Sequence, residues 1–453
     1  MAAEPEIRIA FPAAGATVTT ERQTYVIGSV TPPDTPIRVN GKDITPWRTG
    51  SFIYMAPAEP GTNTLVFRAG KTELSHTFTV PFPSPQWNGK GIRAQQPLQP
   101  LGVVTGETVR LACLAPTGLA VFAAVGERTV PLAPQTGKPN LYKGTVSFGF
   151  PAEKVPVVFY TEGLADAAAA DLTARSEWGA QKVTGPLFET RARSEPGAGE
   201  TVAFLPPEFR VQSAGFVGNS TRFWLGNRLC FAESLLLTPD PGLPLPPRDQ
   251  PLPDIAAGFG PHPPTNRSPS QILIVLDPGH GGLSTGAIGP SGLTEKQVNL
   301  QQAQTVKAVL QQAGFRVLMT RETDVDLGLY ERVGLAYREK ADAFISIHHN
   351  ATPPQTNPEE VRHLSLYAWN DIGRQLARAL HPHLAAVTPI TDRGVMTASF
   401  AVCRNPAVPS CLLELDFINC PEGEEAIQRP EQQRRVSEAV LAGLREWLAA
   451  PAR

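Results

Sequence analysis

Two of the eight histidines stand at the ends of predicted strands, which are places where ligands often bind. His280 comes after the run 272–276, and His348 comes after the run 343–347. Continuous apolar runs of this length are typical of strands buried on both faces of a parallel sheet. Ligands of such sheets bind beyond the carboxyl ends of the strands. A lone histidine at a strand end is more often a hydrogen-bonded core residue than a ligand, so further groups are needed to indicate a site.

Two glutamates occupy positions that are equally unusual for a charge. Glu295 opens a predicted helix, and Glu414 lies inside an otherwise apolar predicted strand. Glu295 can simply favour the helix dipole, and Glu414 can pair with Arg393 or Arg404. An unpaired carboxylate in a buried strand, however, costs several kcal/mol. Two imidazoles, a carboxylate and a further acid at one sheet edge match a catalytic zinc site, which has three protein ligands and an open position.

Strands that alternate with helices must position these groups. Apolar runs and amphipathic stripes after Ser270 predict this alternation, which is typical of a mostly parallel or mixed sheet flanked by helices. Glycine just past a helical stripe, as at Gly314, marks a helix end. The predicted strands are 272–276, 315–319, 343–347, 364–368 and 411–415; the predicted helices are 296–313, 327–340, 372–384 and a closing C-terminal helix.

The sequence pattern of the preceding two-thirds of the chain predicts all-β modules. Short alternating runs separated by turns recur there, and Asn40-Gly41 is a strong hairpin signal. Eleven prolines fall within residues 239–269, which favours a semi-rigid extended linker. We therefore predict five parts: an immunoglobulin-like β domain at 1–84, a second β module at 85–179, an SH3-like barrel at 180–238, a proline-rich linker at 239–270 and a catalytic domain at 271–453.

Composition excludes several classes of protein. The 453 residues carry a formal net charge of −2, which gives no basic field for binding nucleic acid. Apolar residues make up 42% and charged residues 18%, which argues against a disordered chain. No apolar run reaches the roughly 18 residues of a membrane span. We expect a multidomain protein with no nucleic-acid partner and no membrane span.

Seven motifs in order make the segment 272–449 resemble the zinc-dependent N-acetylmuramoyl-L-alanine amidases of the amidase type 3 family. These enzymes trim bacterial peptidoglycan. The resemblance covers the whole predicted catalytic domain. The motifs are Asp277-Pro278-Gly279-His280-Gly281-Gly282, Gly292-Leu293-Thr294-Glu295-Lys296 with Val298-Asn299-Leu300, Thr320-Arg321-Glu322-Thr323-Asp324, Glu331-Arg332-Val333, Ser346-Ile347-His348-His349-Asn350-Ala351, Asp392-Arg393-Gly394-Val395 and Leu413-Glu414-Leu415-Asp416-Phe417-Ile418-Asn419.

The resemblance implies roles for four residues. His280, Glu295 and His348 would be the ligands of Zn²⁺, and Glu414 would be the catalytic acid. Zinc with three protein ligands lowers the pKa of a water to about 7, and Glu414 would take the proton of that water and return it to the departing amine. His349 stands where the family has a small residue, and strand alternation points it away from His348.

The role of Asp277 stays open between two alternatives. It can orient His280 through a hydrogen bond, or it can cap the turn that follows it. Asp416 and Cys420 depart from the family pattern, in a region expected to contact substrate.

The function implied is hydrolysis of the amide bond between N-acetylmuramic acid and L-alanine in peptidoglycan, for cell-wall remodelling and cell separation. Two rival functions are a non-catalytic peptidoglycan-binding or amidase-regulating protein and a zinc peptidase acting on the stem peptide. Because the substrate lies outside the cytoplasmic membrane, we expect an exported protein of the periplasm or cell envelope. Residues Met1-Ala-Ala-Glu-Pro do not form a signal peptide, so we expect the signal to be absent from this chain.

The resemblance also bears on regulation. Some family members carry a helical insert after the second histidine motif that plugs the zinc site until a partner removes it. Here the interval from Ala351 to Leu364 is short and rich in proline, which leaves too little chain for such a plug. We therefore expect no protein activator to be required, so that residues 271–453 alone hydrolyse peptidoglycan. Any restraint would come from the β modules.

Overall fold

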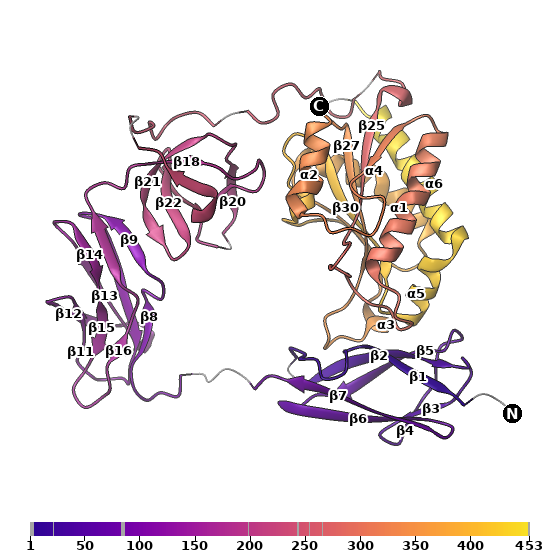
Figure 1. Cartoon of the computed structure of the whole chain (residues 1–453), viewed down its shortest axis with the longest axis horizontal. Coiled ribbons are helices and arrows are strands. Elements are labelled where there is room, and N and C mark those ends of the chain that lie inside the picture. The colour runs from indigo at the N-terminus through magenta and orange to yellow at the C-terminus, as the bar shows by residue number, and fades with distance from the viewer. Residues whose placement is uncertain are drawn as a thin grey trace. The chain divides into compact units, whose positions relative to one another are not determined.

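The computed structural model describes residues 4–20, 22–82, 87–197, 199–241, 244–252, 254–264 and 266–451. The chain forms two compact units, one made of Met1–Pro83 with Ile255–Arg453 and the other of Ser84–Asp254. Figure 1 shows that helices gather at the C-terminal end of the chain, whereas strands dominate the rest. Within the described ranges, no helix is both long enough and apolar enough to cross a membrane.

The first unit begins with a domain of two small sheets, which we call the N-terminal β domain. One sheet has the order β1-β2-β5 and the other the order β4-β3-β6-β7. Asn40 and Gly41 have φ values of 47° and 83°, so the predicted hairpin is present, with a turn of the left-handed kind. The strands are β1 (Glu6–Phe11), β2 (Gln23–Thr31), β3 (Ile37–Val39), β4 (Lys42–Ile44), β5 (Ser51–Pro57), β6 (Gly61–Ala69) and β7 (Thr72–Val80).

The second unit is also all β. One sheet has the order β16-β15-β11-β12-β13-β10-β8, and the other runs β14-β17-β9-β21-β22-β23-β19-β20, with β18 and β24 paired beside it. The strands are β8 (Arg93–Gln96), β9 (Leu101–Val104), β10 (Thr108–Leu114), β11 (Val121–Val125), β12 (Arg128–Gln135), β13 (Lys138–Ser147), β14 (Ala152–Val155), β15 (Val157–Tyr160), β16 (Ala167–Ala168), β17 (Leu172–Arg175), β18 (Ala180–Val183), β19 (Arg191–Arg193), β20 (Thr201–Phe204), β21 (Arg210–Val217), β22 (Ser220–Leu225), β23 (Arg228–Glu233) and β24 (Leu237–Pro239), with the short helix η1 (Ser234–Leu236).

Strand β9 joins the two halves of this unit, because it pairs in parallel with β17 and antiparallel with β21. Arg222 on β22 donates to the carbonyl of Gly102 (2.7 Å) and forms an ion pair with Glu107. The stretches predicted as a second module and a barrel therefore share one sheet. Between β24 and η2 (Pro269–Gln271), the described residues form neither helix nor strand.

The C-terminal part of the first unit is an α/β domain. Its sheet has the order β26-β25-β27-β30-β28-β29; all neighbours are parallel except β28 and β30. This arrangement confirms the predicted class, all-β modules followed by a mostly parallel sheet with helices. The elements are β25 (Leu273–Pro278), α1 (Glu295–Gln312), β26 (Arg316–Met319), α2 (Leu329–Arg338), β27 (Ala343–Asn350), α3 (Pro358–Val361), β28 (His363–Ala368), α4 (Asp371–Val387), β29 (Thr391–Thr397), η3 (Ala401–Cys403), β30 (Ser410–Phe417), α5 (Pro421–Gln428) and α6 (Pro430–Ala449).

Strand β29 was not predicted from the sequence, for a physical reason. Strand β29 lies at the sheet edge and is largely exposed, so it has no apolar run to mark it. The predicted strands and helices of this domain are present, with ends displaced by a few residues.

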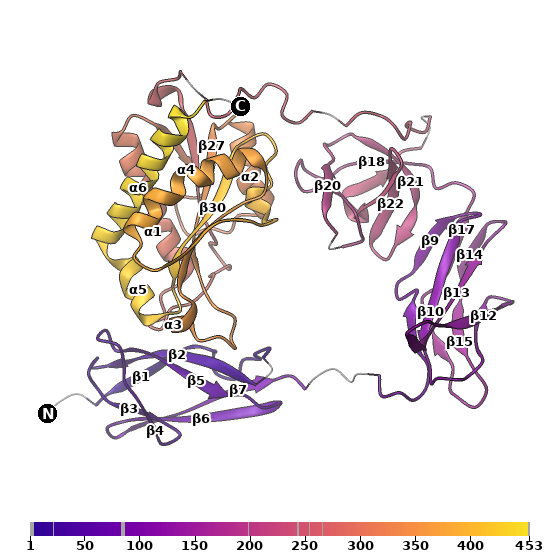
Figure 2. The same ribbon diagram turned by 180° about the vertical axis from the view of Figure 1, so that it is seen from behind.

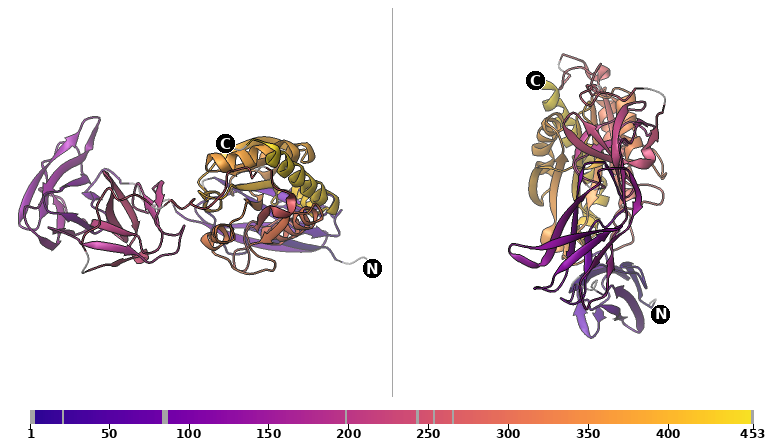
Figure 3. Two further views of the ribbon diagram at one scale, coloured as in Figure 1. Left: turned by 90° about the horizontal axis from the view of Figure 1, so that it is seen from above. Right: turned by 90° about the vertical axis from the view of Figure 1, so that its left-hand side faces the viewer.

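The two faces of the α/β sheet are covered by different helices. Helices α1, α4 and α6 bury one face, as the views in Figures 1, 2 and 3 show, while α2 and η3 contact β27 and β30. Because side chains alternate along a strand, successive residues of β27 face these two layers in turn. The main core includes Ile274, Leu276, Ile345, Ile347 and Leu413 from the strands and Val306, Leu380, Val440 and Trp447 from the helices.

We predict that Gly443→Ala destabilises the α/β domain. A Cβ atom at this position of α6 would lie 2.6 Å from the Cα of Leu380 and 2.8 Å from the carbonyl oxygen of Ala379, both backbone atoms of α4. Alanine favours a helix over glycine by about 1 kcal/mol, but overpacking a core costs about 1–3 kcal/mol. Because the backbone of α4 cannot rotate away, we expect the overpacking to dominate and the midpoint of thermal unfolding to fall.

Gly334→Ala is the matched control in α2. A Cβ atom there meets only the Nη1 end of the flexible Arg338 side chain, at 2.9 Å. Its helix propensity should therefore raise or preserve the unfolding midpoint. An equal loss of stability in both variants would contradict this account of the α4–α6 contact.

Candidate active site

His280 is placed by the turn that follows β25. Its φ of 61° is left-handed, an unusual conformation for a histidine that redirects the chain sharply after Pro278. The ring nitrogen Nδ1 lies 2.9 Å from Ser284 Oγ, and Nε2 lies 3.1 Å from Glu295 Oε2. The side chain is 28% exposed, so this part of the site is open to solvent.

His348 lies near the end of β27, next to the same turn. Its Nδ1 is 2.9 Å from Glu295 Oε1. A Cβ atom at position 279 would stand 2.1 Å from the His348 Nε2 atom, so only glycine allows the imidazole to lie against the turn. The ring centroids of His280 and His348 are 5.0 Å apart. The turn and the strand therefore bring both rings to one place.

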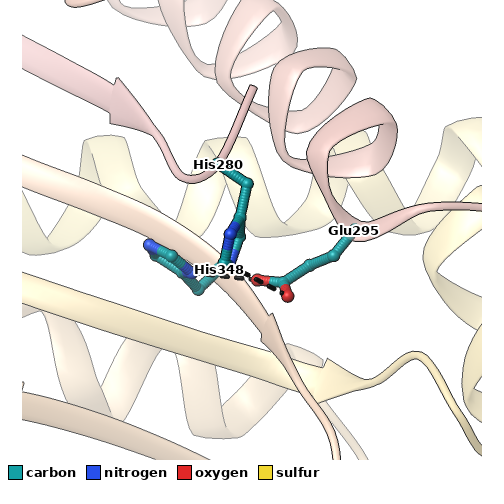
Figure 4. Close-up of side chains that lie close together, drawn as sticks. All are labelled: His280, Glu295 and His348. Carbon is teal, nitrogen blue, oxygen red and sulfur yellow. Dashed lines mark hydrogen bonds and ion pairs between the residues drawn. The ribbon is translucent and has the colours of Figure 1, made fainter. Parts of the chain in front are cut away.

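Glu295 is the first residue of α1, after the N-cap Thr294. Its side chain points from the helix start toward both histidines (Figure 4). One ligand atom from each of His280, Glu295 and His348 lies within 4.8 Å of the others. Further donors hold the carboxylate: the backbone N–H of Ala287 (2.9 Å) and the side-chain amide of Asn299 (3.2 Å).

The electrostatics of this cluster favour a cation. Burial raises the pKa of the Glu295 carboxyl, but hydrogen bonds from the two histidines outweigh it and hold that pKa well below its usual range. Burial lowers the pKa of His348, but the hydrogen bond to Glu295 and the negative charges of Glu295, Glu414 and Asp277 together outweigh that effect and raise the pKa. The buried carboxylate therefore requires positive charge beside it. Two imidazoles and a carboxylate with solvent access are a donor set that suits Zn²⁺ with an open position.

Glu414 stands beside His348 on the neighbouring strand β30. The two residues are in register across the parallel pair, and Ser365 of β28 is opposite Glu414 on its other side. Glu414 Oε2 is shielded from solvent and has no hydrogen-bond partner among the described residues. Burial raises the pKa of Glu414 to about 8, although His348 lowers it. A carboxyl with a pKa near neutrality can both accept and donate a proton.

Known proteins are similar to the part of the chain that contains these residues. The sequence model of the family described as "N-acetylmuramoyl-L-alanine amidase" matches residues 274–446. The amidase AmiA of Salmonella typhimurium is 30% identical over 229 residues, which cover 40% of this chain and 78% of that protein. The chain belongs to the N-acetylmuramoyl-L-alanine amidase family. It is therefore a hydrolase, and we call its α/β domain the amidase domain.

Other relatives match the same region. The amidase LytC of Bacillus subtilis is 36% identical over 171 residues, 38% of this chain and 34% of that protein. Among solved structures, the amidase AmiC2 of Nostoc punctiforme is 35% identical, with a TM-score of 0.38, and the match covers 40% of this chain and 98% of that one.

The structure answers several questions that the sequence left open. Asp277 does not touch the His280 ring: its carboxylate accepts from Arg332 Nη1 (2.8 Å), Thr320 Oγ1 (2.6 Å) and Ser346 Oγ (2.7 Å). The orienting role considered for Asp277 is therefore wrong, because this fully buried acid is already saturated by other donors.

The ion pair considered for Glu414 is also absent from the described residues. The Arg404 guanidinium binds Ser399 instead (3.0 Å from Nε to Oγ). His349 lies on the opposite side of β27, where its Nδ1 is 2.9 Å from Asn299 Oδ1. Burial lowers the pKa of His349 to about 4, so it is a neutral, internally bonded residue.

Two arginines that support the site had no role assigned from the sequence. Arg321 donates to the carbonyls of Pro278 and Gly279, each at 2.9 Å, and Arg332 donates to those of Pro278 and His280, each at 2.9 Å. Both arginines are nearly fully buried. They fix the turn that carries His280. Their motifs stand out in the sequence, but residue type alone gives no sign that these charges turn inward.

We predict that His348→Ala abolishes metal retention while His349→Ala preserves it. The His348 ring is one of the three converging donors, whereas the His349 ring bonds Asn299 on the other side of the strand. The wild-type chain should retain about one zinc per chain. Metal analysis of the full chain after gel filtration measures this. Loss of zinc from His349→Ala alone would reverse the assignment.

Proposed function

We propose that this protein is a zinc-dependent amidase that hydrolyses the bond between N-acetylmuramic acid and L-alanine in peptidoglycan. One observation carries the proposal: His280, Glu295 and His348 converge next to Glu414, a shielded acid whose Oε2 has no partner among the described residues. The family membership and the names of the relatives support the bond assignment. We also propose a place in the periplasm or cell envelope and a role in cell-wall remodelling such as cell separation, because the proposed substrate lies in the cell wall.

The chemistry divides between the metal and Glu414. Zinc, when bound by the three donors, supplies a Lewis acid that makes water nucleophilic near neutral pH and polarises the amide carbonyl. Glu414 takes the proton of the attacking water and passes it to the nitrogen of the departing amine. Since a dication nearby favours the ionised form of a carboxyl, metal loading would lower the pKa of Glu414 from about 8 and prepare it as a base.

The open site supports hydrolysis without an activator. The interval after His348 contains only the single-turn helix α3 (Pro358–Val361) between β27 and β28, and the His280 side chain remains 28% exposed. We therefore propose that the protein needs no partner to uncover its site.

Mass spectrometry of peptidoglycan digested by the full chain tests the bond that is cut. An amidase should release stem peptides with a free L-alanine amine and leave lactyl groups on intact glycan. A stem peptidase would leave the N-acetylmuramic acid–L-alanine bond whole. A non-catalytic binding protein would release nothing, and either of these results would refute the proposal.

Glu414→Gln should separate metal binding from chemistry. The amide cannot accept the water proton, so we expect kcat to fall about 10²- to 10⁴-fold. Zinc content should stay unchanged, and the unfolding midpoint should not fall, because the variant removes a shielded carboxylate that lacks a partner on Oε2. Activity on peptidoglycan, metal analysis and thermal unfolding measure the three effects.

Glu438→Gln is the control for this variant, since Glu438 forms an exposed ion pair with Arg434 on α6 (2.8 Å). It should leave activity, zinc content and stability near wild type. Turnover close to the wild-type rate in Glu414→Gln would remove Glu414 from the mechanism.

A further inference from the structure

The N-terminal β domain contacts the loop that follows β27, the strand of His348. Tyr25 on β2 donates its backbone N–H to the carbonyl of Pro354 (2.7 Å) and its hydroxyl to that of Thr352 (3.2 Å). The side chain of Asn419 donates to Thr352 Oγ1 (3.0 Å) from the end of β30. Because Tyr25 is only 5% exposed, this contact is a packed one. The loop 351–356 is thus held from both sides.

The same domain makes a second contact through the turn between β4 and β5. Trp47 Nε1 donates to Glu425 Oε2 (2.6 Å), and Arg48 reaches both carboxylate oxygens of Glu425 (2.7 and 2.8 Å). The hydrogen bond from Arg48 is the largest cause that holds the pKa of Glu425 at about 2, despite partial burial. A bidentate guanidinium–carboxylate pair fixes the relative orientation of the two side chains as well as the distance between them. Helix α5 is therefore anchored to the β domain.

The neighbouring carboxylate, Glu424, extends this contact to the metal cluster. Glu424 is 2% exposed and accepts from Ser51 Oγ on β5 (3.3 Å). It also accepts from the backbone N–H (3.0 Å) and hydroxyl (2.6 Å) of Ser291. Ser291 belongs to the loop 289–294, which leads directly into Glu295 at the start of α1. A side chain of the β domain and the loop before Glu295 thus share one buried carboxylate.

The contacts do not cover the site itself. With both contacts in place, the side chains of His280 and His348 are still 28% and 16% exposed. The β domain therefore holds the chain on either side of the cluster without plugging it. A tether that served only to deliver the enzyme would not need Ser51 to reach the buried Glu424 carboxylate that holds Ser291.

We propose that the N-terminal β domain is a positioning part of the catalytic unit, which fixes the loops 289–294 and 351–356 next to Glu295 and His348. Trp47 and Arg48 hold α5, whose Glu424 binds the loop 289–294. Tyr25 binds the loop 351–356 directly. The catalytic consequence rests on the proposed amidase function. The mechanical consequence, ordering of the two loops, does not.

Two full-chain variants test the two contacts separately by amide hydrogen exchange. Trp47→Phe/Arg48→Ala removes the side-chain donors to Glu425, and Tyr25→Phe removes the hydroxyl bond to Thr352. We expect exchange to rise about three- to tenfold in loop 289–294 for the first variant and in loop 351–356 for the second. Exchange in the core strands β2 and β6 should stay unchanged, which separates positioning from general loss of stability.

Arg68→Ala is the matched control, because it removes an exposed ion pair with Glu73 (2.8 Å) inside the same β domain. Arg68→Ala should leave amide hydrogen exchange unchanged in both loops. In the two test variants kcat on peptidoglycan should fall about three- to tenfold, as the loosened loops shift the donor groups, whereas Arg68→Ala should keep the wild-type kcat.

Unchanged exchange in both loops would overturn the proposal, and so would raised exchange with an unchanged kcat when the wild-type chain is active. A different result is that exchange rises in the loops of the two test variants while their fold stays intact, and that the wild-type chain cleaves no amide bond. This result would support the ordering of the loops by the β domain. That same result would refute the amidase proposal, so the two failures can be told apart.

Discussion

The buried carboxylate of Glu295 is the interaction on which the rest of the site depends. Its two oxygens face both histidine rings and also accept from the backbone N–H of Ala287 and the side chain of Asn299. A charge in this position is tolerated only because several donors and a positive partner surround it. Hydrogen bonds to the histidine rings partly offset the negative charge of Glu295, and a divalent cation would supply the positive partner. The helix start of α1 adds a favourable dipole.

The backbone around the cluster is held by the protein's own buried groups. Pro278 and Gly279 have their carbonyls held by Arg321 and Arg332, and Asp277 neutralises Arg332 from within the sheet. These groups keep the left-handed turn at His280 in place, and the lack of a side chain at Gly279 lets the His348 ring approach it. Donor groups held in this way lose little freedom when they bind, which is the advantage of a preorganised site.

Much of this arrangement could be predicted from the sequence, because it depends on local signals. Apolar runs mark the central strands, and His280 and His348 stand at the ends of two of these strands, so the carboxyl edge of the sheet brings them together. The partners of Asp277 and Arg404 could not be predicted, since a charged residue in a polar motif can turn inward or outward with equal ease. Burial of Arg321 and Arg332 depends on carbonyls that exist only once the turn has formed. Strand β29 could not be predicted because an exposed edge strand lacks the run or alternation of apolar residues that marks a buried strand.

The contacts of the N-terminal β domain were beyond sequence analysis for another reason. Tyr25 and Pro354, or Arg48 and Glu425, are separated by most of the chain, and each looks like an ordinary surface residue by type. Strand alternation can place Tyr25 in a buried row, but it cannot say which surface buries it. The extra signal is the pair Glu424-Glu425 in α5. Glu424 lies in the first turn, where an acid suits the helix dipole, yet in the structure it binds Ser291, and Glu425 binds Arg48. Acidic residues of α5 therefore also join the amidase domain to the N-terminal β domain, which is far from them in the sequence.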